Sequence, residues 1–175
     1  MIRLFLLGFM GTGKTTLGRA LAADLGISFC DLDHYIETRY MKSISSIFKD
    51  KGQDYFREVE ARLLREVGEF EDVVISCGGS TPLYFNNMQY MNSQGITIWL
   101  DSSIPVLFRR LKVARSGRPL ISSMNDTQLE QYIGEELARR NPFFSKAAFR
   151  YSGDMLESEE QIADSVRGVR SLLNI

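Results

Sequence analysis

The sequence predicts an α/β fold in which a five-stranded parallel sheet is flanked by helices and carries a mobile lid. The first observation is that apolar runs alternate with longer stretches of helical periodicity along the chain. The second is that these runs are short and mostly apolar, as expected for parallel strands covered on both faces. The third is the length of 175 residues, which fits a single domain over residues 1–175.

The apolar runs place the strands, and leucine spacing places the helix after the first of them. Leu17, Leu21 and Leu25 recur at every fourth position, and Gly26 predicts the end of that helix. We expect strands at residues 2–7, 28–31, 73–76, 96–100 and 147–151.

Three further segments complete the expected organisation. Residues 32–68 hold two or three helices between strands, and residues 112–125 are polar, basic and marked by glycine and proline, as in a mobile lid. Near the end of the chain, Ser158 and Gln161 predict a capping box. The helix that follows has an apolar face made of Ile162, Val166, Val169 and Leu173.

Composition gives no electrostatic reason to expect a nucleic-acid or anionic-membrane partner, since Lys plus Arg is 21 and Asp plus Glu is 22. No apolar run approaches the ~20 residues of a membrane span. Cys30 and Cys77 lie far apart and outside any CxxC pair, so we expect reduced thiols and a cytoplasmic protein. The single histidine, His34, cannot build a His/Cys metal site.

The stretch GFMGTGKTT follows the first strand and opens a helix. Gly8, Gly13, Lys14 and Thr15 satisfy the pattern G-x-x-x-x-G-K-[ST], in which backbone N–H groups surround phosphate oxygens. Lys14 would reach the outer phosphates and the Thr15 hydroxyl would ligate Mg²⁺. The alternative is a glycine-rich turn that binds nothing. We expect nucleotide binding by Gly11, Thr12, Gly13, Lys14, Thr15 and Thr16.

Carboxylates follow the second strand in the segment DLD. Alternation places Asp31 and Asp33 on one face, where one could hold a Mg²⁺ water and the other accept a hydroxyl proton. The alternative for Asp33 is helix N-capping. A second carboxylate of nucleotide sites usually ends an apolar strand, which nominates Asp101, although the strand at 73–76 ends in Ser76 instead.

Arginines and a second glycine turn form the remaining candidate groups. Arg57 precedes Glu60 by three residues, a spacing that also fits an exposed ion pair on a helix. Gly78 and Gly79 follow a strand and could bind a ligand or simply turn the chain. Each arginine alone fits a solvated surface residue. Three arginines are candidates, namely Arg57, Arg118 and Arg140. Together with the two carboxylates, these arginines suit a small substrate that carries hydroxyls and an anionic group.

With these motifs, the chain resembles the shikimate kinase family, whose members are P-loop kinases of the nucleoside monophosphate kinase fold. The resemblance rests on GFMGTGKTT, DLDHYIE, FREVE, CGG, RPL and RNPFF, which occur in the family's order and approximate spacing over residues 2–150. It implies phosphorylation of the shikimate 3-hydroxyl in aromatic amino-acid biosynthesis, with ATP as co-substrate and Mg²⁺ as cofactor. It also implies that Lys14, Asp33 and Arg118 are catalytic.

The resemblance implies further roles. Arg57 and Arg140 would clamp the substrate carboxylate, Asp33 would contact the reacting hydroxyl, and the amides of Gly78 and Gly79 would contact the substrate. The magnesium neighbourhood would comprise Thr15 and Asp31, with Ser76 nearby. Either Arg109 or Arg110 would lie beside the adenine, and Arg118 would meet the transferring phosphate as well as the nucleotide.

The resemblance also places the strands at 73–76 and 96–100 on either side of the first strand, which makes Asp101 structural. The chain departs from the family at Ser80, where a third glycine is usual, and at Gln53, where glutamate is common. It departs again at Phe144, where tyrosine is frequent, and residues 151–157 match no motif of the base-binding loop.

Two alternatives remain. Another small-molecule kinase of the same fold, such as a gluconate kinase, has less need of the arginine pair, although gluconate also carries a carboxylate. A non-catalytic nucleotide-binding switch is expected to lose Lys14, Asp33 or Arg118, and all three are present, while the N-K-x-D guanine motif is not. We expect a monomer that acts on shikimate and ATP.

Overall fold

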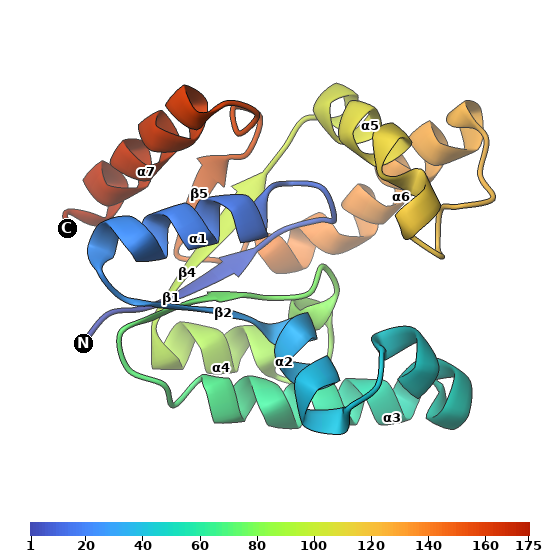
Figure 1. The fold of residues 1–175 in the computed structure, drawn as a ribbon, viewed down its shortest axis with the longest axis horizontal. Coiled ribbons are helices and arrows are strands. Elements are labelled where there is room, and N and C mark those ends of the chain that lie inside the picture. Colours follow the sequence, from blue (N-terminus) through green and yellow to red (C-terminus); the bar gives the residue numbers. More distant parts are fainter.

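The protein is described by a computed structural model over residues 1–175. A five-stranded sheet with the order β2-β3-β1-β4-β5 lies at its centre, and all neighbouring strands run parallel (Figure 1). The strands are β1 (Arg3–Leu7), β2 (Ser28–Asp31), β3 (Val73–Ser76), β4 (Ile96–Asp101) and β5 (Phe149–Ser152). This confirms the predicted fold class and the placement of β3 and β4 on either side of β1.

β1 is the topological switch point of the sheet, because the chain adds strands first on one side of it and then on the other. The chain adds β2 and β3 on one side of β1, and β4 and β5 on the other. In open parallel sheets, ligands bind beyond the carboxyl ends of the strands at this switch point. The loop that follows β1 therefore lies where a binding crevice is expected.

The fifth strand begins two residues later than the sequence indicates, at Phe149 instead of Ala147. The Ala148 N–H donates to the Thr97 hydroxyl at 2.8 Å instead of to a backbone carbonyl of the neighbouring strand. A side chain thus takes the place of the first rung of the ladder, and regular pairing starts one residue further on.

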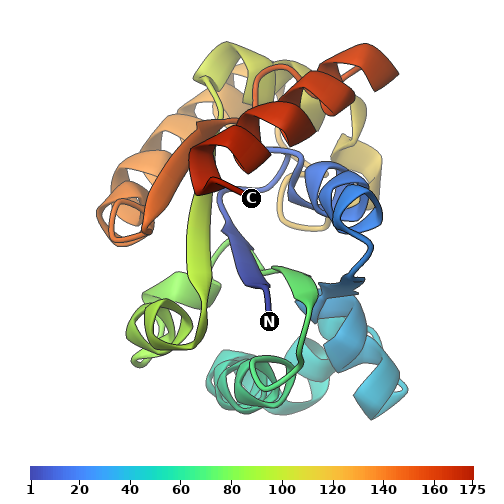
Figure 2. The same cartoon turned by 90° about the vertical axis from the view of Figure 1, so that its left-hand side faces the viewer.

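Helices cover both faces of the sheet (Figure 2). One face carries α1 (Lys14–Leu25) and α7 (Glu159–Leu173), which pack against each other and share one apolar cluster with the sheet. A second cluster joins the opposite face to helices from the middle of the chain. These helices are α2 (Leu32–Tyr40), α3 (Ile44–Val67) and α4 (Asn87–Gln94).

A third apolar cluster lies beyond the carboxyl ends of the strands. It joins Phe9, in the loop after β1, to α5 (Ile104–Val113) and α6 (Asp126–Phe144). Short 3-10 turns precede two of the helices, η1 (Thr81–Leu83) before α4 and η2 (Arg115–Gly117) before α6. The cluster fixes one wall of the crevice to the loop itself.

The predicted lid, residues 112–125, is a compact corner between α5 and α6 in this conformation. Ile121 is fully buried in the third cluster. Arg115 donates to the Met124 carbonyl and pairs with Asp126 at 2.6 Å. These contacts tie the base of the corner to α6, and movement of this segment stays a prediction.

The cap of α7 differs from the predicted capping box. Ser158 Oγ accepts from the Gln161 N–H at 3.2 Å, as expected. Gln161 Oε1 instead accepts from the Glu157 N–H, one residue before the position that a capping box requires. The reciprocal box forms at α6, where Asn125 and Gln128 satisfy each other's backbone N–H groups. None of the helices has both the length and the apolar character needed to cross a membrane.

The turn out of β1 has no room for a side chain at Gly8. Its φ of 145° is rare for residues with a Cβ, and a Cβ there would overlap the Leu100 carbonyl oxygen of β4. We therefore expect Gly8→Ala to lower the free energy of unfolding by at least about 2 kcal/mol in chemical denaturation.

The matched substitution is Gly134→Ala, inside α6, where a Cβ would meet nothing within 4 Å. It should raise stability by up to about 1 kcal/mol, because alanine is the better helix former. Equal effects of the two substitutions would contradict the assignment of Gly8 as a packing-limited position.

Candidate functional site

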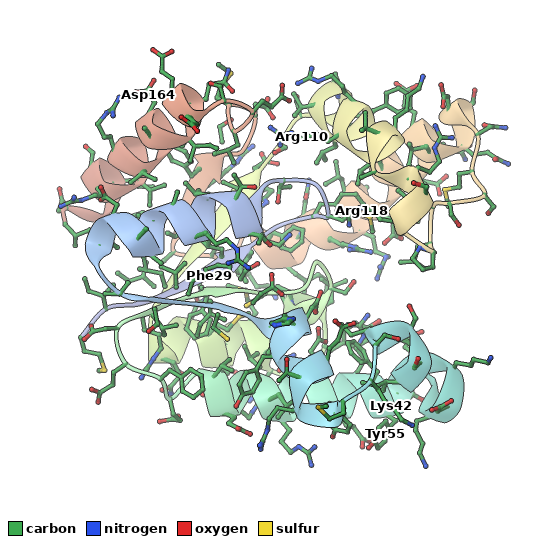
Figure 3. All side chains as sticks on the ribbon, viewed as in Figure 1. Phe29, Lys42, Tyr55, Arg110, Arg118 and Asp164 are labelled. Carbon is green, nitrogen blue, oxygen red and sulfur yellow. The ribbon has the colours of Figure 1, made fainter.

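A cavity of about 440 Å³ opens at the carboxyl ends of the strands, between the loop after β1 and α5. Figure 3 shows Arg110 and Arg118 on the side of the molecule formed by α5 and α6, near that loop. The cavity wall brings together most of the candidate residues: Gly11, Gly13, Lys14, Thr15, Thr16, Asp31, Asp33, Gly78, Gly79, Arg110 and Arg118.

Lys14 is the cation at the floor of this cavity. Its Nζ donates to the carbonyl oxygens of Gly8 at 2.8 Å and Phe9 at 2.9 Å, so the side chain folds back over its own loop. Burial lowers the pKa of Lys14 to about 8, while nearby Asp33 acts in the opposite direction. A phosphate placed beside this ammonium would stabilise the positive charge, which burial deprives of hydration.

Thr12 is the one expected nucleotide-binding residue of the loop that does not line the cavity. Its hydroxyl donates to the Phe9 carbonyl at 2.9 Å and the residue is buried. The side chain closes the loop on itself, and the nucleotide contact expected of Thr12 stays a prediction.

The two carboxylates after β2 have different surroundings. Asp31 accepts the Thr15 hydroxyl at 3.0 Å through Oδ2 and the His34 N–H at 3.3 Å through Oδ1. Asp31 is thus the N-cap of α2, and the alternative that Asp33 caps this helix is wrong. The Asp33 carboxylate faces the second glycine turn, with Oδ1 3.1 Å from the point where a Cβ on Gly78 would lie.

Asp33 is poised to exchange a proton near neutral pH. Burial raises its pKa to about 6, and the negative charges of Asp31 and Glu60 act in the same direction. Lys14 opposes them without cancelling them. A carboxylate with this pKa, facing a cavity, is suited to accept a proton from a bound hydroxyl.

The oxygen atoms near Thr15 fit a magnesium ion that keeps waters and phosphate oxygens as ligands. Thr15 and Asp31 offer a hydroxyl and a carboxylate in contact, and Ser76 pairs with Asp31 in the sheet register. Nowhere does the chain gather three His, Cys, Asp or Glu residues into a metal cage. Mg²⁺ is commonly bound by one or two carboxylates together with substrate phosphates, so this donor set fits it.

Arg57 is held from behind by a buried carboxylate. Its Nη1 lies 2.8 Å from Glu60 Oε2, with exposed side-chain fractions of 13% for Arg57 and 1% for Glu60. The ion pair predicted from the spacing is present, but it is largely buried, so the alternative of an exposed pair is wrong. Glu60 Oε1 also accepts the Thr81 hydroxyl at 2.7 Å and lies 3.2 Å from the Cβ position of Gly78. Arg57 itself does not line the cavity, and Glu60 connects it to the Gly78 turn in the cavity wall.

Arg140 has the same type of support on α6. Its Nε and Nη2 donate to Glu136 Oε2 at 2.9 and 2.5 Å, and its Nη1 donates to the Gly79 carbonyl at 3.1 Å. The residue is only 5% exposed, and its guanidinium carbon lies 4.9 Å from the centre of the Phe9 ring. The alternative of a solvated surface arginine is wrong for Arg140.

The structure distinguishes Arg110 from Arg109. Arg110 donates to the carbonyls of Gly11 at 3.1 Å and Gly153 at 2.9 Å, and so joins the phosphate loop to the segment after β5. Arg109 is well exposed and pairs with Glu157. Arg110 is therefore the arginine at the cavity, whereas the position of the adenine stays a prediction.

Sequence reasoning missed several residues of the site. Leu156 lines the cavity beside Gly13, in the segment that matched no motif. Glu136 carries a usable signal, since it lies four residues before Arg140 on a helix. Asp101, nominated by the strand-end rule, pairs with Arg150 outside the cavity, in agreement with its structural assignment.

Two departures from the family pattern are accommodated locally. Ser80 has φ −114°, an ordinary backbone angle, so the third turn position has no need of glycine. Phe144 is fully buried and stacks on Trp99 with ring centroids 6.0 Å apart. A phenolic hydroxyl at this position would have to be buried, so phenylalanine suits this core.

The glycine-rich loop after the central strand, Lys14 and Asp33 meet at one cavity. Arg57 and Arg140 do not line this cavity, but each contacts its glycine turn, Arg57 through Glu60 and Arg140 directly. This fold and site are those of a P-loop phosphotransferase. The family model of shikimate kinase matches residues 10–169. A shikimate kinase of Bacteroides fragilis is 50% identical over 100% of this chain and 98% of its own length. The chain belongs to the shikimate kinase family.

Solved structures agree with this assignment. The crystal structure of shikimate kinase from Bacteroides thetaiotaomicron superposes with a TM-score of 0.97 at 44% identity, over 99% of each chain. Shikimate kinase from Acinetobacter baumannii, in complex with shikimate, superposes with a TM-score of 0.85 at 27% identity, over 99% of this chain and 94% of that one.

The raised pKa of Asp33 predicts a stability gain when its charge is removed. The folded-state pKa of about 6 lies above the ordinary aspartate value of 3.8, so the fold favours the protonated form. This stabilisation is present at low pH and is lost as the pH rises from about 4 to about 6. At pH 8, Asp33→Asn should raise the free energy of unfolding by about 1–3 kcal/mol.

The measurement is the thermal midpoint of wild type and Asp33→Asn between pH 4 and pH 8. The advantage of the variant should shrink as the pH falls below about 6, because wild-type Asp33 then gains its proton. A lower midpoint for the variant at pH 8 would show that the ionised carboxylate stabilises α2.

Proposed function

We propose that the cavity residues divide the shikimate kinase reaction among themselves as follows. As a member of its family, the chain phosphorylates shikimate with ATP. The 3-hydroxyl receives the γ-phosphoryl group, which yields shikimate 3-phosphate and ADP. The observation that carries the assignment of roles is the convergence of Lys14, Asp33 and the Gly78–Gly79 turn on one cavity.

At the nucleotide end, the phosphate loop and Lys14 bind the phosphates of ATP. Lys14 is half-buried, so its charge acts on the transferring phosphoryl group with reduced screening by water. Thr15 and Asp31 would hold Mg²⁺, which neutralises the charge of the phosphate oxygens when bound. Arg110 supports the base side of the site by joining Gly11 to the segment around Gly153.

At the substrate end, Asp33 accepts the proton of the reacting hydroxyl. Its carboxylate lies beside the Gly78 turn, where backbone groups can approach a ligand closely. Arg57 and Arg140 bind the substrate carboxylate from two helices. Since each already has a glutamate partner, neither arginine carries an uncompensated buried charge before the substrate arrives.

Arg118 acts from the corner between α5 and α6. It lines the cavity in this conformation, and its charge is close enough to lower the pKa of Lys14. We assign it to the charge that develops on the transferring phosphoryl group. Closure of residues 112–125 over the nucleotide would bring it nearer and exclude water. We also propose that the protein acts as a cytoplasmic monomer without nucleic-acid or membrane partners.

The function is tested by ADP release in the presence of ATP, Mg²⁺ and one candidate acceptor at a time. Shikimate should support turnover, whereas quinate and gluconate should support less than about a tenth of that rate. Lys14→Met should nearly abolish ADP release with shikimate, because the charge at the transferring phosphate is lost. Faster turnover with gluconate would favour the gluconate kinase alternative, and ATP binding without any turnover would favour the switch.

Arg118→Ala tests the role of the corner. Turnover should fall at least about a hundredfold, since a cis arginine at a transferring phosphoryl group contributes roughly 10³–10⁵ in rate. The Michaelis constant for shikimate should change no more than a few-fold, as expected for a contact made in the transition state.

The control for this variant is Arg167→Ala, an exposed arginine on α7 that pairs with Asp164. Its turnover should remain near that of wild type. If Arg118→Ala behaves like this control, Arg118 has no part in phosphoryl transfer.

A further inference from the structure

The guanidinium of Arg57 lies inside a box of three aromatic rings. Its central carbon is 4.3 Å from the centre of the Tyr84 ring, 5.1 Å from that of Phe56 and 5.9 Å from that of Phe48. Two of these rings come from α3 itself, whereas Tyr84 comes from the segment that follows η1. The shortest of the three cation–ring distances is thus supplied by a different part of the chain.

Tyr84 is tied to α3 by its hydroxyl. The Gln53 side-chain amide donates to Tyr84 Oη at 2.8 Å. Both residues of this hydrogen bond lie close to Arg57, since the Tyr84 ring contacts its guanidinium and Gln53 lies one turn before it on the same helix. The bond therefore fixes the ring over the guanidinium and fixes the segment after η1 to α3.

A break in α3 makes this arrangement possible. Gly52 has φ 84° and ψ 174°, which no regular helix contains, and the part of α3 before it takes another direction (Figure 1). A Cβ on Gly52 would meet nothing within 4 Å, so the glycine is needed for its backbone angle and not for space. The bend brings Phe48 against Phe56, with centroids 4.5 Å apart, and places Gln53 at the corner.

The box leaves one buried donor of Arg57 without a partner. Nη1 pairs with Glu60, but the buried Nε has no hydrogen-bond acceptor within the protein. A buried, unpaired guanidinium N–H costs free energy until an acceptor arrives. Nη2 also makes no hydrogen bond to the protein and is the donor left for an anionic ligand group. A guanidinium already held by stacked rings loses less side-chain entropy on binding such a group.

We propose that Tyr84 and Gln53 are positioning residues for shikimate binding: Gln53 holds the Tyr84 ring against Arg57, and the ring holds the guanidinium toward the substrate carboxylate. The inference rests on the proposed role of Arg57.

The test compares substitutions at Tyr84 with the same substitutions at Tyr90. Tyr90 also lies over an arginine, Arg65, at 4.9 Å, and its hydroxyl donates to the Arg65 carbonyl at 3.0 Å, but Arg65 has no proposed role in substrate binding. Tyr84→Leu should raise the Michaelis constant for shikimate about tenfold and leave that for ATP within twofold. Tyr90→Leu should lower the thermal midpoint and leave both Michaelis constants within twofold.

The hydrogen bond is tested separately from the ring. Tyr84→Phe and Gln53→Leu should each raise the shikimate Michaelis constant about two- to fivefold, since either change removes the same bond. Gln53→Glu should stay within twofold of wild type, because the Tyr84 hydroxyl can donate to the new carboxylate.

Arg57→Ala separates failure of this inference from failure of the proposed function. If Tyr84 acts through Arg57, adding Tyr84→Leu to Arg57→Ala should raise the shikimate Michaelis constant no further. A large effect of Arg57→Ala with none for Tyr84→Leu overturns the positioning role alone. No effect of Arg57→Ala removes Arg57 from substrate binding and overturns both. Equal effects of Tyr84→Leu on shikimate and ATP would also overturn the inference.

Discussion

Pairing of buried charges is the constraint on which this site depends. A cavity that handles an anionic nucleotide and an anionic acceptor needs cations that water does not screen, and such cations are costly to bury alone. The chain meets this need with a carboxylate on the same helix as each arginine proposed to bind the substrate. Glu60 lies one turn after Arg57, and Glu136 lies one turn before Arg140. These pairs hold the arginines in place without consuming all their donors.

The same constraint explains why the two aspartates after β2 behave differently. Asp31 is satisfied by the Thr15 hydroxyl and by the first turn of α2, and so belongs to the scaffold as much as to the site. Asp33 receives no hydrogen bond within the protein and faces Asp31 and Glu60 across a buried space. Burial is the main cause of its raised pKa, and the negative charges of Asp31 and Glu60 add to it. Because no hydrogen bond stabilises the ionised form of Asp33, this carboxylate is suited to accept a proton.

Sheet order brings these groups together. Because β1 lies between β3 and β4, the phosphate loop, the Gly78–Gly79 turn and the N-terminus of α5 all emerge at one end of the sheet. Phe9 links them further, since it packs in the cluster with α5 and α6 and lies beneath the Arg140 guanidinium. The loop proposed to bind phosphate therefore shares its support with Arg140, the residue proposed to bind the acceptor.

The sequence by itself determined the parts whose physics is local. The strand, the glycine-rich loop and the helix opened by Lys14 follow from adjacent residues, and the ordered motifs indicated the family. Which aspartate caps α2 and whether Arg109 or Arg110 faces the cavity were decided only by tertiary structure. The same is true of the burial of the Arg57–Glu60 pair and of Tyr84 over Arg57. Backbone propensity acts between near neighbours, whereas burial and side-chain convergence depend on how distant segments pack, and only the assembled sheet and its helices fix that packing.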